Sequence, residues 1–124
     1  MKEIITTKNA PAAVGAYSQA VKSGNLLFCS GQIALDPASG VLTGSDIKAQ
    51  TEQVMLNISA VLATSKATFD NVVKTTCFLA DINDFAKFNE VYAKYFTGKP
   101  ARSCVAVSAL PKGALVEVEV IAVV

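Results

Sequence analysis

Histidine is absent from this 124-residue chain, and its absence excludes several kinds of active site. A chain without histidine has no Ser–His or Cys–His nucleophilic machinery, and it lacks the usual ligand for zinc and haem. Any acid–base chemistry must therefore use carboxylate, tyrosine, cysteine or lysine side chains, or water.

Cysteine is scarce, and long apolar runs are missing. Cys29, Cys77 and Cys104 are odd in number and widely spaced, so they form neither a C-x-x-C pair nor a disulfide framework. This pattern fits a reducing compartment, and we expect a cytoplasmic protein. No segment approaches the roughly 18 apolar residues of a membrane span, and the N-terminus has no signal-peptide hydrophobic region, so no membrane partner is expected.

Charge is also sparse. The formal net charge is +1 and the lysines are scattered, so no electrostatic footprint for nucleic acid is present. The length predicts one domain, residues 1–124. Hydrophobic residues make up 52% of the chain and charged residues 17%, which is an apolar composition for a domain of this size. The surplus of apolar residues could line an interface between subunits.

Arginine occurs once, at Arg102, against ten lysines. A guanidinium is a planar, rigid fork that can grip a carboxylate or phosphate through two parallel hydrogen bonds, which lysine cannot do. We therefore predict that Arg102 binds an anionic ligand. A structural ion pair or a solvated strand end is the alternative.

The order of predicted elements is β-β-β-α-β-α-β-β. A β-prone segment at 2–7 precedes a hairpin around the turn at 23–25, whose second strand covers 26–30 and runs into Gly31. Apolar residues at helical spacing predict one helix from a cap at Ser45 or Asp46 to near Lys66. A second helix begins at 81–84 and stops at Gly98 and Pro100, and the remaining predicted strands are 72–79, 102–107 and 115–123.

Two helices are too few for a doubly wound sheet. We therefore predict an α+β fold, with a single mixed β-sheet and both helices packed on one face. The second helix carries an aromatic stripe that we interpret as core, formed by Phe85, Phe88, Tyr92 and Phe96.

Candidate chemistry lies in the two last strands. Side chains alternate along a strand, so Arg102 and Cys104 share one face, and Glu117 and Glu119 share a face opposite their valine neighbours. The residues alone favour glutamates that face water; the alternative is that one handles water or a proton near Arg102. Cys104 is interpreted as a small core residue, because nothing obvious activates it.

The segment Ser30-Gly31-Gln32 ends a buried strand. Glycine at this position allows either a close approach of a ligand to the backbone or a plain bulge, and the residues do not choose between them. No glycine-rich phosphate-binding motif occurs in the chain.

The full length of the chain resembles the reactive intermediate deaminase A family, also called the YjgF/YER057c/UK114 family. The resemblance rests on long, gapped motifs, namely Asn9-Ala10-Pro11-Ala12-Ala13, Gly15-x-Tyr17-Ser18-Gln19, Ser30-Gly31-Gln32, Asp36-Pro37-x-x-Gly40, and Pro100-Ala101-Arg102-Ser103 followed by Leu110-Pro111 and Val116-Glu117-Val118. It implies a chorismate-mutase-like fold and a homotrimer with clefts between its subunits.

The resemblance further implies an enamine/imine deaminase that needs no metal and no cofactor. Its ligands would be short 2-imino acids such as 2-iminobutanoate and 2-iminopropanoate, released by pyridoxal-phosphate-dependent dehydratases, and its products would be 2-oxo acids and ammonia. Arg102 would grip the substrate carboxylate, and Glu117 would orient and activate the attacking water. The cleft would also be lined by Tyr17, Ser30, Gly31, Asn89 and Cys104.

The resemblance leaves more than one function open, because members of the family are described with different functions. A non-catalytic, small-acid-binding regulatory or chaperone-like module is the alternative that keeps Arg102 without turnover. An endoribonuclease or translation inhibitor is a more distant alternative, because the chain lacks a basic surface motif with interleaved aromatic residues.

Overall fold

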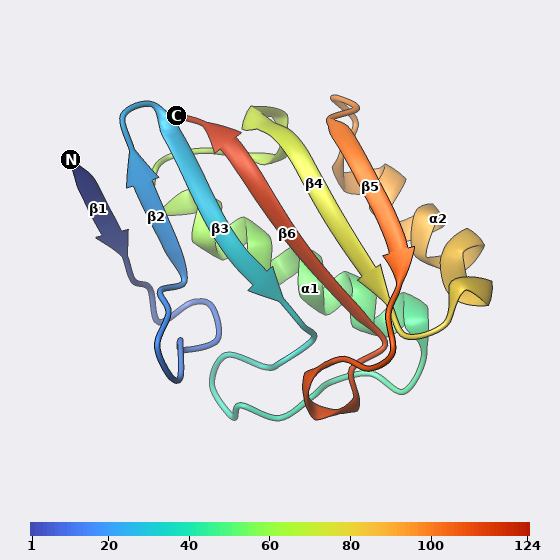
Figure 1. The fold of residues 1–124 in the computed structure, drawn as a ribbon. Helices are drawn as coiled ribbons and strands as arrows, with labels where there is room; N and C mark the ends of the chain where they lie inside the picture. The colour runs from blue at the N-terminus through green and yellow to red at the C-terminus, as the bar shows by residue number, and fades with distance from the viewer.

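One mixed β-sheet forms the body of the protein (Figure 1). The computed structural model describes residues 1–124. The strands lie in the order β1-β2-β3-β6-β4-β5; all neighbours are antiparallel except β4 and β5, which are parallel. Their bounds are Lys2–Ile5 (β1), Ala20–Ser23 (β2), Leu26–Gln32 (β3), Val72–Leu79 (β4), Ala101–Ala106 (β5) and Val116–Val123 (β6).

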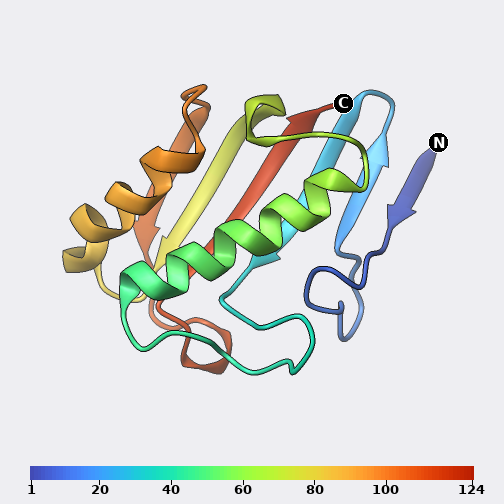
Figure 2. The same ribbon diagram turned by 180° about the vertical axis from the view of Figure 1, so that it is seen from behind.

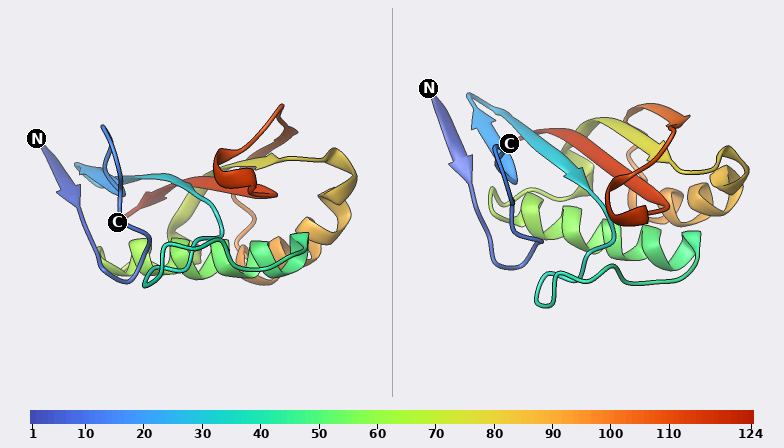
Figure 3. Two further views of the ribbon diagram at one scale, coloured as in Figure 1. Left: turned by 90° about the horizontal axis from the view of Figure 1, so that it is seen from below. Right: turned by 60° about the horizontal axis from the view of Figure 1, so that its bottom comes forward.

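Both helices cover the same face of this sheet, as the view from behind and the view from below show (Figures 2 and 3). Helix α1 (Ile47–Ala63) crosses the central strands, and α2 (Phe85–Tyr95) lies beside it behind β4 and β5. Single 3-10 turns lie at Phe69–Asn71, Ile82–Asp84 and Pro111–Gly113. The predicted α+β architecture is therefore confirmed.

Local signals explain where α1 begins and ends. The side chain of Asp46 accepts a hydrogen bond from the backbone N–H of Ala49 at 2.8 Å, which is the N-cap expected from the sequence. The helix ends at Ala63, slightly before the predicted end near Lys66. The chain then closes a turn in which Lys66 adopts a left-handed backbone with φ of 57°, so Lys66 terminates the helix instead of belonging to it.

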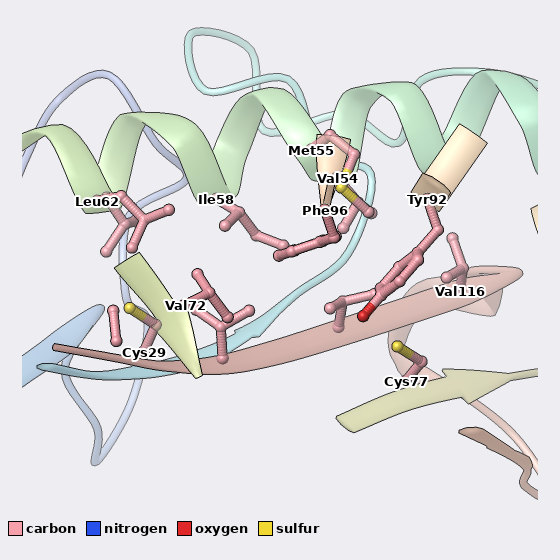
Figure 4. Packing of buried hydrophobic residues seen from close by; sticks show 14 of the residues in the cluster. Cys29, Val54, Met55, Ile58, Leu62, Val72, Cys77, Tyr92, Phe96 and Val116 are labelled. Atoms are coloured by element: carbon pink, nitrogen blue, oxygen red, sulfur yellow. The ribbon is translucent and has the colours of Figure 1, made fainter. Parts of the chain in front are cut away.

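The core lies between the helices and the sheet (Figure 4). In β6 the side chains alternate, so that Val116, Val118 and Val120 are buried under the helices while the glutamates between them point to the other face. Of the aromatic stripe predicted as core, Phe88, Tyr92 and Phe96 are buried, whereas Phe85 is only half-buried.

The opposite face of the sheet has no covering layer in one chain. Phe28 is 43% exposed and Val105 46% exposed, and both belong to this open face, where Phe28 pairs with Ile121 across the strands. The register places Val105 on this face and turns Val118 and Val120 towards the helices. None of the helices is long and apolar enough to cross a membrane.

Candidate functional site

Arg102 lies on β5 beneath one stripe of helix α2. Phe85, Asn89 and Tyr92 are spaced four and three residues apart, so they share one side of the helix. The Cζ atom of Arg102 lies 4.7 Å from the centre of the Tyr92 ring and 5.3 Å from the centre of the Phe85 ring. Its Nη1 donates a hydrogen bond of 2.7 Å to Oδ1 of Asn89. The helix thus holds the guanidinium by two rings and one amide.

No carboxylate neutralises Arg102 within the chain. The two ion pairs of the protein join Lys48 to Glu90 and Lys94 to Glu52, and neither includes Arg102. A guanidinium has five N–H donors, and Asn89 is the one hydrogen-bond acceptor that Arg102 meets. The side chain is exposed and lines a cavity of about 520 Å³. Its charge and most of its fork are therefore free for an anion.

Glu117 occupies a different place, on the open face of the sheet against Gly31. A bulge in β3 between Cys29 and Gln32 brings the glycine opposite β6. A Cβ atom at position 31 would lie 2.8 Å from both Cδ and Oε2 of Glu117, so only glycine leaves room for this carboxyl group. The bulge predicted at Gly31 is confirmed, and the group that lies close to its backbone is the side chain of Glu117.

The environment of Glu117 disfavours its ionised form. Burial raises the pKa of the half-buried carboxyl above its usual value, and the neighbouring charge of Glu119 raises it further. A carboxylate whose pKa is shifted towards neutrality is a stronger base than an ordinary glutamate. Glu117 is therefore suited to take a proton from water.

Tyr17, Gly31 and Glu117 line one groove. The volume of this groove is about 570 Å³. Tyr17 is 55% exposed, and its hydroxyl accepts a long hydrogen bond of 3.4 Å from the N–H of Val14. The loops around the groove are fixed by two buried amides. Gln19 bonds the backbone of Thr7, Ala10 and Pro11, and Asn57 donates to the carbonyls of Ile33 and Leu35.

Ser30 and Cys104 take supporting places. The hydroxyl of Ser30 donates to the carbonyl of Ser18 at 2.6 Å, which ties β3 to the Tyr17 loop. Cys104 is half-buried beside Cys77 on the face of Arg102, as the alternation predicts. Burial raises the pKa of the Cys104 thiol, against a smaller lowering by Arg102, so this cysteine is not an activated nucleophile.

The candidate residues thus form two groups on opposite faces of the sheet. Arg102 pairs with Thr75, which in turn pairs with Val120, and all three face the helices, whereas Glu117 pairs with Phe78 on the open face. Glu117 precedes Val120 by three positions, which is roughly 10 Å along the strand, and two strand spacings add roughly 10 Å across the sheet. Within one chain, a small molecule held by Arg102 does not reach Glu117.

Sequence reasoning missed the aromatic contacts of Arg102 and the amides that fix the loops. The spacing of the α2 stripe correctly predicted buried rings, but it could not show that Phe85 and Tyr92 also face a guanidinium from another element. Gln19 carried a usable signal, because it stands in the quoted Tyr17-Ser18-Gln19 motif. Asn57 carried one too, since it is an amide among the apolar positions of a helix.

A mixed sheet of this topology, with two helices on one face, is the architecture of the reactive intermediate deaminase A proteins. Residues 7–124 match the family model described as Endoribonuclease L-PSP. The chain therefore belongs to this family.

The similarity extends over whole chains. The 2-iminobutanoate/2-iminopropanoate deaminase of Rattus norvegicus is 48% identical over 124 residues, which cover 99% of this chain and 90% of the rat protein. The structure of YyfA from Yersinia pestis, a Rid family protein, is 54% identical with a TM-score of 0.97 and covers 100% of both chains. The structure of E. coli TdcF with bound serine is 39% identical with a TM-score of 0.93 and covers 98% of both chains.

Proposed function

We propose that this protein hydrolyses short 2-imino acids and their enamine tautomers, such as 2-iminobutanoate and 2-iminopropanoate, to 2-oxo acids and ammonia. The observation that carries the proposal is the pair of complementary groups: a guanidinium without a carboxylate partner and a carboxyl with a raised pKa in a groove. The rat relative, named for this activity and 48% identical, supports the same reaction.

Glu117 is the base in this proposal. An imine carbon is already electrophilic, so the enzyme mainly has to hold the acid and place a water molecule. Glu117 takes a proton from the water while the new C–O bond forms and the C=N electron pair moves to nitrogen. The proton then passes to the nitrogen; the new hydroxyl gives its own proton back to Glu117 as its oxygen forms the C=O bond, the C–N bond breaks, and ammonia leaves the 2-oxo acid. The carboxylate also stabilises the positive charge of a protonated iminium.

Arg102 is the carboxylate clamp. Its free N–H groups can donate two parallel hydrogen bonds to the acid group that all 2-imino acids share. Tyr17, Ser30, Gly31, Asn89 and Cys104 would shape the cleft, with Asn89 acting on the guanidinium and Gly31 leaving space for Glu117. The bound serine of E. coli TdcF, a small amino acid, is a ligand of similar size.

The separation of Arg102 and Glu117 supports a site shared between chains. The two residues lie on opposite faces of one sheet, so a four-carbon acid can touch both only if they come from different subunits. The open face also exposes Phe28 and Val105, which is typical of an interface. We therefore propose a closed homotrimer in which each cleft combines Arg102 of one chain with Glu117 of a neighbour.

A coupled assay tests the reaction. Threonine dehydratase generates 2-iminobutanoate in the cuvette, and the release of ammonia and 2-oxobutanoate is timed with and without the protein. We expect acceleration with the wild-type protein and none with Glu117→Gln, which serves as the matched negative control. Equal time courses with and without wild-type protein would reject the deaminase.

The same assay separates the alternatives. A non-catalytic small-acid-binding module would bind 2-oxobutanoate without accelerating its formation, and calorimetry on the same sample reports that binding. The ribonuclease alternative has no support from charge, since the formal net charge is only +1. Salt-dependent binding of RNA would revive it.

A further inference from the structure

Tyr92 belongs to the buried core and also contacts Arg102. Thr75 lies on β4, between β6 and β5, and is 0% exposed. Its hydroxyl shares a hydrogen bond of 2.8 Å with the hydroxyl of Tyr92, which projects from α2 towards the sheet (Figure 4). The face of the same ring lies under the guanidinium of Arg102 at 4.7 Å. The ring is therefore held at its far end by a fully buried residue of the sheet.

We propose that Tyr92 is a positioning residue, which sets the orientation of the Arg102 guanidinium so that its unpaired N–H edge faces the ligand. A cation is attracted to the face of an aromatic ring, and this attraction is stronger where water is partly excluded. The hydrogen bond to Thr75 fixes the tip of the ring, the stacked ring of Phe96, with its centre 4.5 Å away, fixes its plane, and the ring in turn orients the guanidinium. Asn89 holds one Nη1 proton, so that the rest of the fork stays open. This role rests on the proposed carboxylate clamp.

The single arginine makes the proposal measurable without any ligand. Because Arg102 is the only arginine, the protein has a single arginine Nε–H signal in a ¹H–¹⁵N NMR spectrum. In the wild-type protein we expect this signal to show a heteronuclear NOE close to that of the backbone. In Tyr92→Leu we expect a clearly lower NOE, because the guanidinium loses the nearer of its two rings and keeps only Phe85 and the bond to Asn89. Equal values in the two proteins would reject the positioning role.

Activity gives the second measurement. The clamp holds a group that does not react, so its loss of order should raise KM while kcat changes little. We expect KM for 2-iminobutanoate to rise about tenfold in Tyr92→Leu. Tyr92→Phe keeps the ring and loses the bond to Thr75, so a rise of about two- to threefold is expected, which makes Phe the partial rescue of Leu. An unchanged KM in Tyr92→Leu would contradict the inference.

Tyr95 provides a matched control on the same helix. Its hydroxyl donates to Oε2 of Glu52 on α1 and does not contact Arg102. Tyr92→Phe and Tyr95→Phe each remove one hydroxyl with its hydrogen bond, so both should lower the melting temperature. Only Tyr92→Phe should change KM and the Arg102 signal; a similar change in Tyr95→Phe would mean that general loosening of α2 is the cause.

The outcomes also separate this inference from the proposed function. Wild-type protein that neither deaminates nor binds 2-oxobutanoate would reject the clamp, while the NMR measurement would still decide whether Tyr92 orders Arg102. Wild-type activity with no effect of Tyr92→Leu on KM or on the NOE would reject the positioning role and leave the deaminase standing.

Discussion

Three side chains on successive turns of one helix surround Arg102, whereas Glu117 lies among segments that are far apart in the sequence. The first region needs only α2 and the adjoining edge strand. The second needs a bulge in β3, the loops that follow β1 and β3, and two buried amides that hold those loops. The difference implies that one half of the site is rigid in a single chain, while the other depends on long-range contacts and on what covers the open face.

The two regions also differ in the charge that they leave unsatisfied. Arg102 is exposed, cationic and without an acidic partner, so it attracts an anion before any partner chain arrives. Glu117 is half-buried, and its pKa is raised because burial disfavours the carboxylate. A positive neighbour would stabilise the ionised form. A protonated imino acid carries both complementary charges, the carboxylate for Arg102 and the iminium for Glu117.

The largest effect is expected from Glu117→Gln. Glutamine is close in size to glutamate but is a poor base and does not stabilise a cation, so turnover should fall by about 10²–10⁴-fold. The variant should still bind a 2-oxo acid, because the clamp is intact, and calorimetry with 2-oxobutanoate checks this point. Glu119→Gln is the control on the same face and should stay close to wild type. The reverse pattern would place the base at Glu119.

The same variant has a predictable effect on stability. The folded-state pKa of Glu117 is raised, so its contribution to stability is fully present below the unfolded pKa and is lost as the pH rises through the folded value. At neutral pH the ionised carboxylate is therefore unfavourable, and Glu117→Gln should melt slightly higher than wild type. The difference should shrink as the pH is lowered, which thermal melts between pH 4 and pH 8 measure.

Arg102→Lys tests the half of the site formed by α2 and β5. It should lower activity somewhat less than Glu117→Gln does. Lysine keeps the charge but cannot form the bidentate fork, and each lost charge-assisted hydrogen bond costs about one to two decades in rate. We expect kcat/KM to fall about 100-fold or more, close to the value for Arg102→Ala. A lysine variant with wild-type kcat/KM would mean that positive charge alone suffices at this position.

The sequence predicted the helical half better than the loop half for physical reasons. The rarity of arginine singled out Arg102, and the helical period placed Phe88 and Phe96 in the core. The period gives the side of a helix on which a residue lies, but not which side chain of a distant strand meets it, so the contacts of Tyr92 with Arg102 were missed. Glu117 was assigned from the family resemblance, because the residues alone favoured a solvent-facing glutamate.

The bulge at Gly31 shows the same limit. Glycine at the end of a strand indicates an unusual backbone but not its purpose, which depends on what lies opposite in the sheet. That neighbour is Glu117, which lies 86 residues further along the 124-residue chain. The overall architecture was easier to predict, because two helices and several short strands leave few ways to bury their apolar faces.

Mixing the Arg102→Lys and Glu117→Gln variants tests whether the two residues of one cleft come from different chains. Arg102→Lys and Glu117→Gln chains in equal amounts, unfolded and refolded together, should form random trimers. An intact site needs Arg102 from one chain and Glu117 from its neighbour, so about a quarter of the sites should be functional. Each variant refolded alone is the control. A mixture as inactive as its components would contradict the shared cleft, and native mass spectrometry of the mixture reports whether three chains associate.

The smallest effect is expected from Cys104→Ser, which probes the face that Cys104 shares with Arg102. The thiol is half-buried, burial raises its pKa, and the chain contains no histidine to activate it. Serine is nearly isosteric and its hydroxyl is no better as a nucleophile, so kcat/KM should stay within about twofold of wild type while the fold is retained. The measurement is the coupled ammonia assay on protein whose far-UV circular dichroism matches wild type. Complete loss of activity in such a well-folded variant would mean that the Arg102 half supplies a covalent nucleophile as well as a clamp. The division between a binding half on α2 and β5 and a reacting half on the open face would then no longer hold.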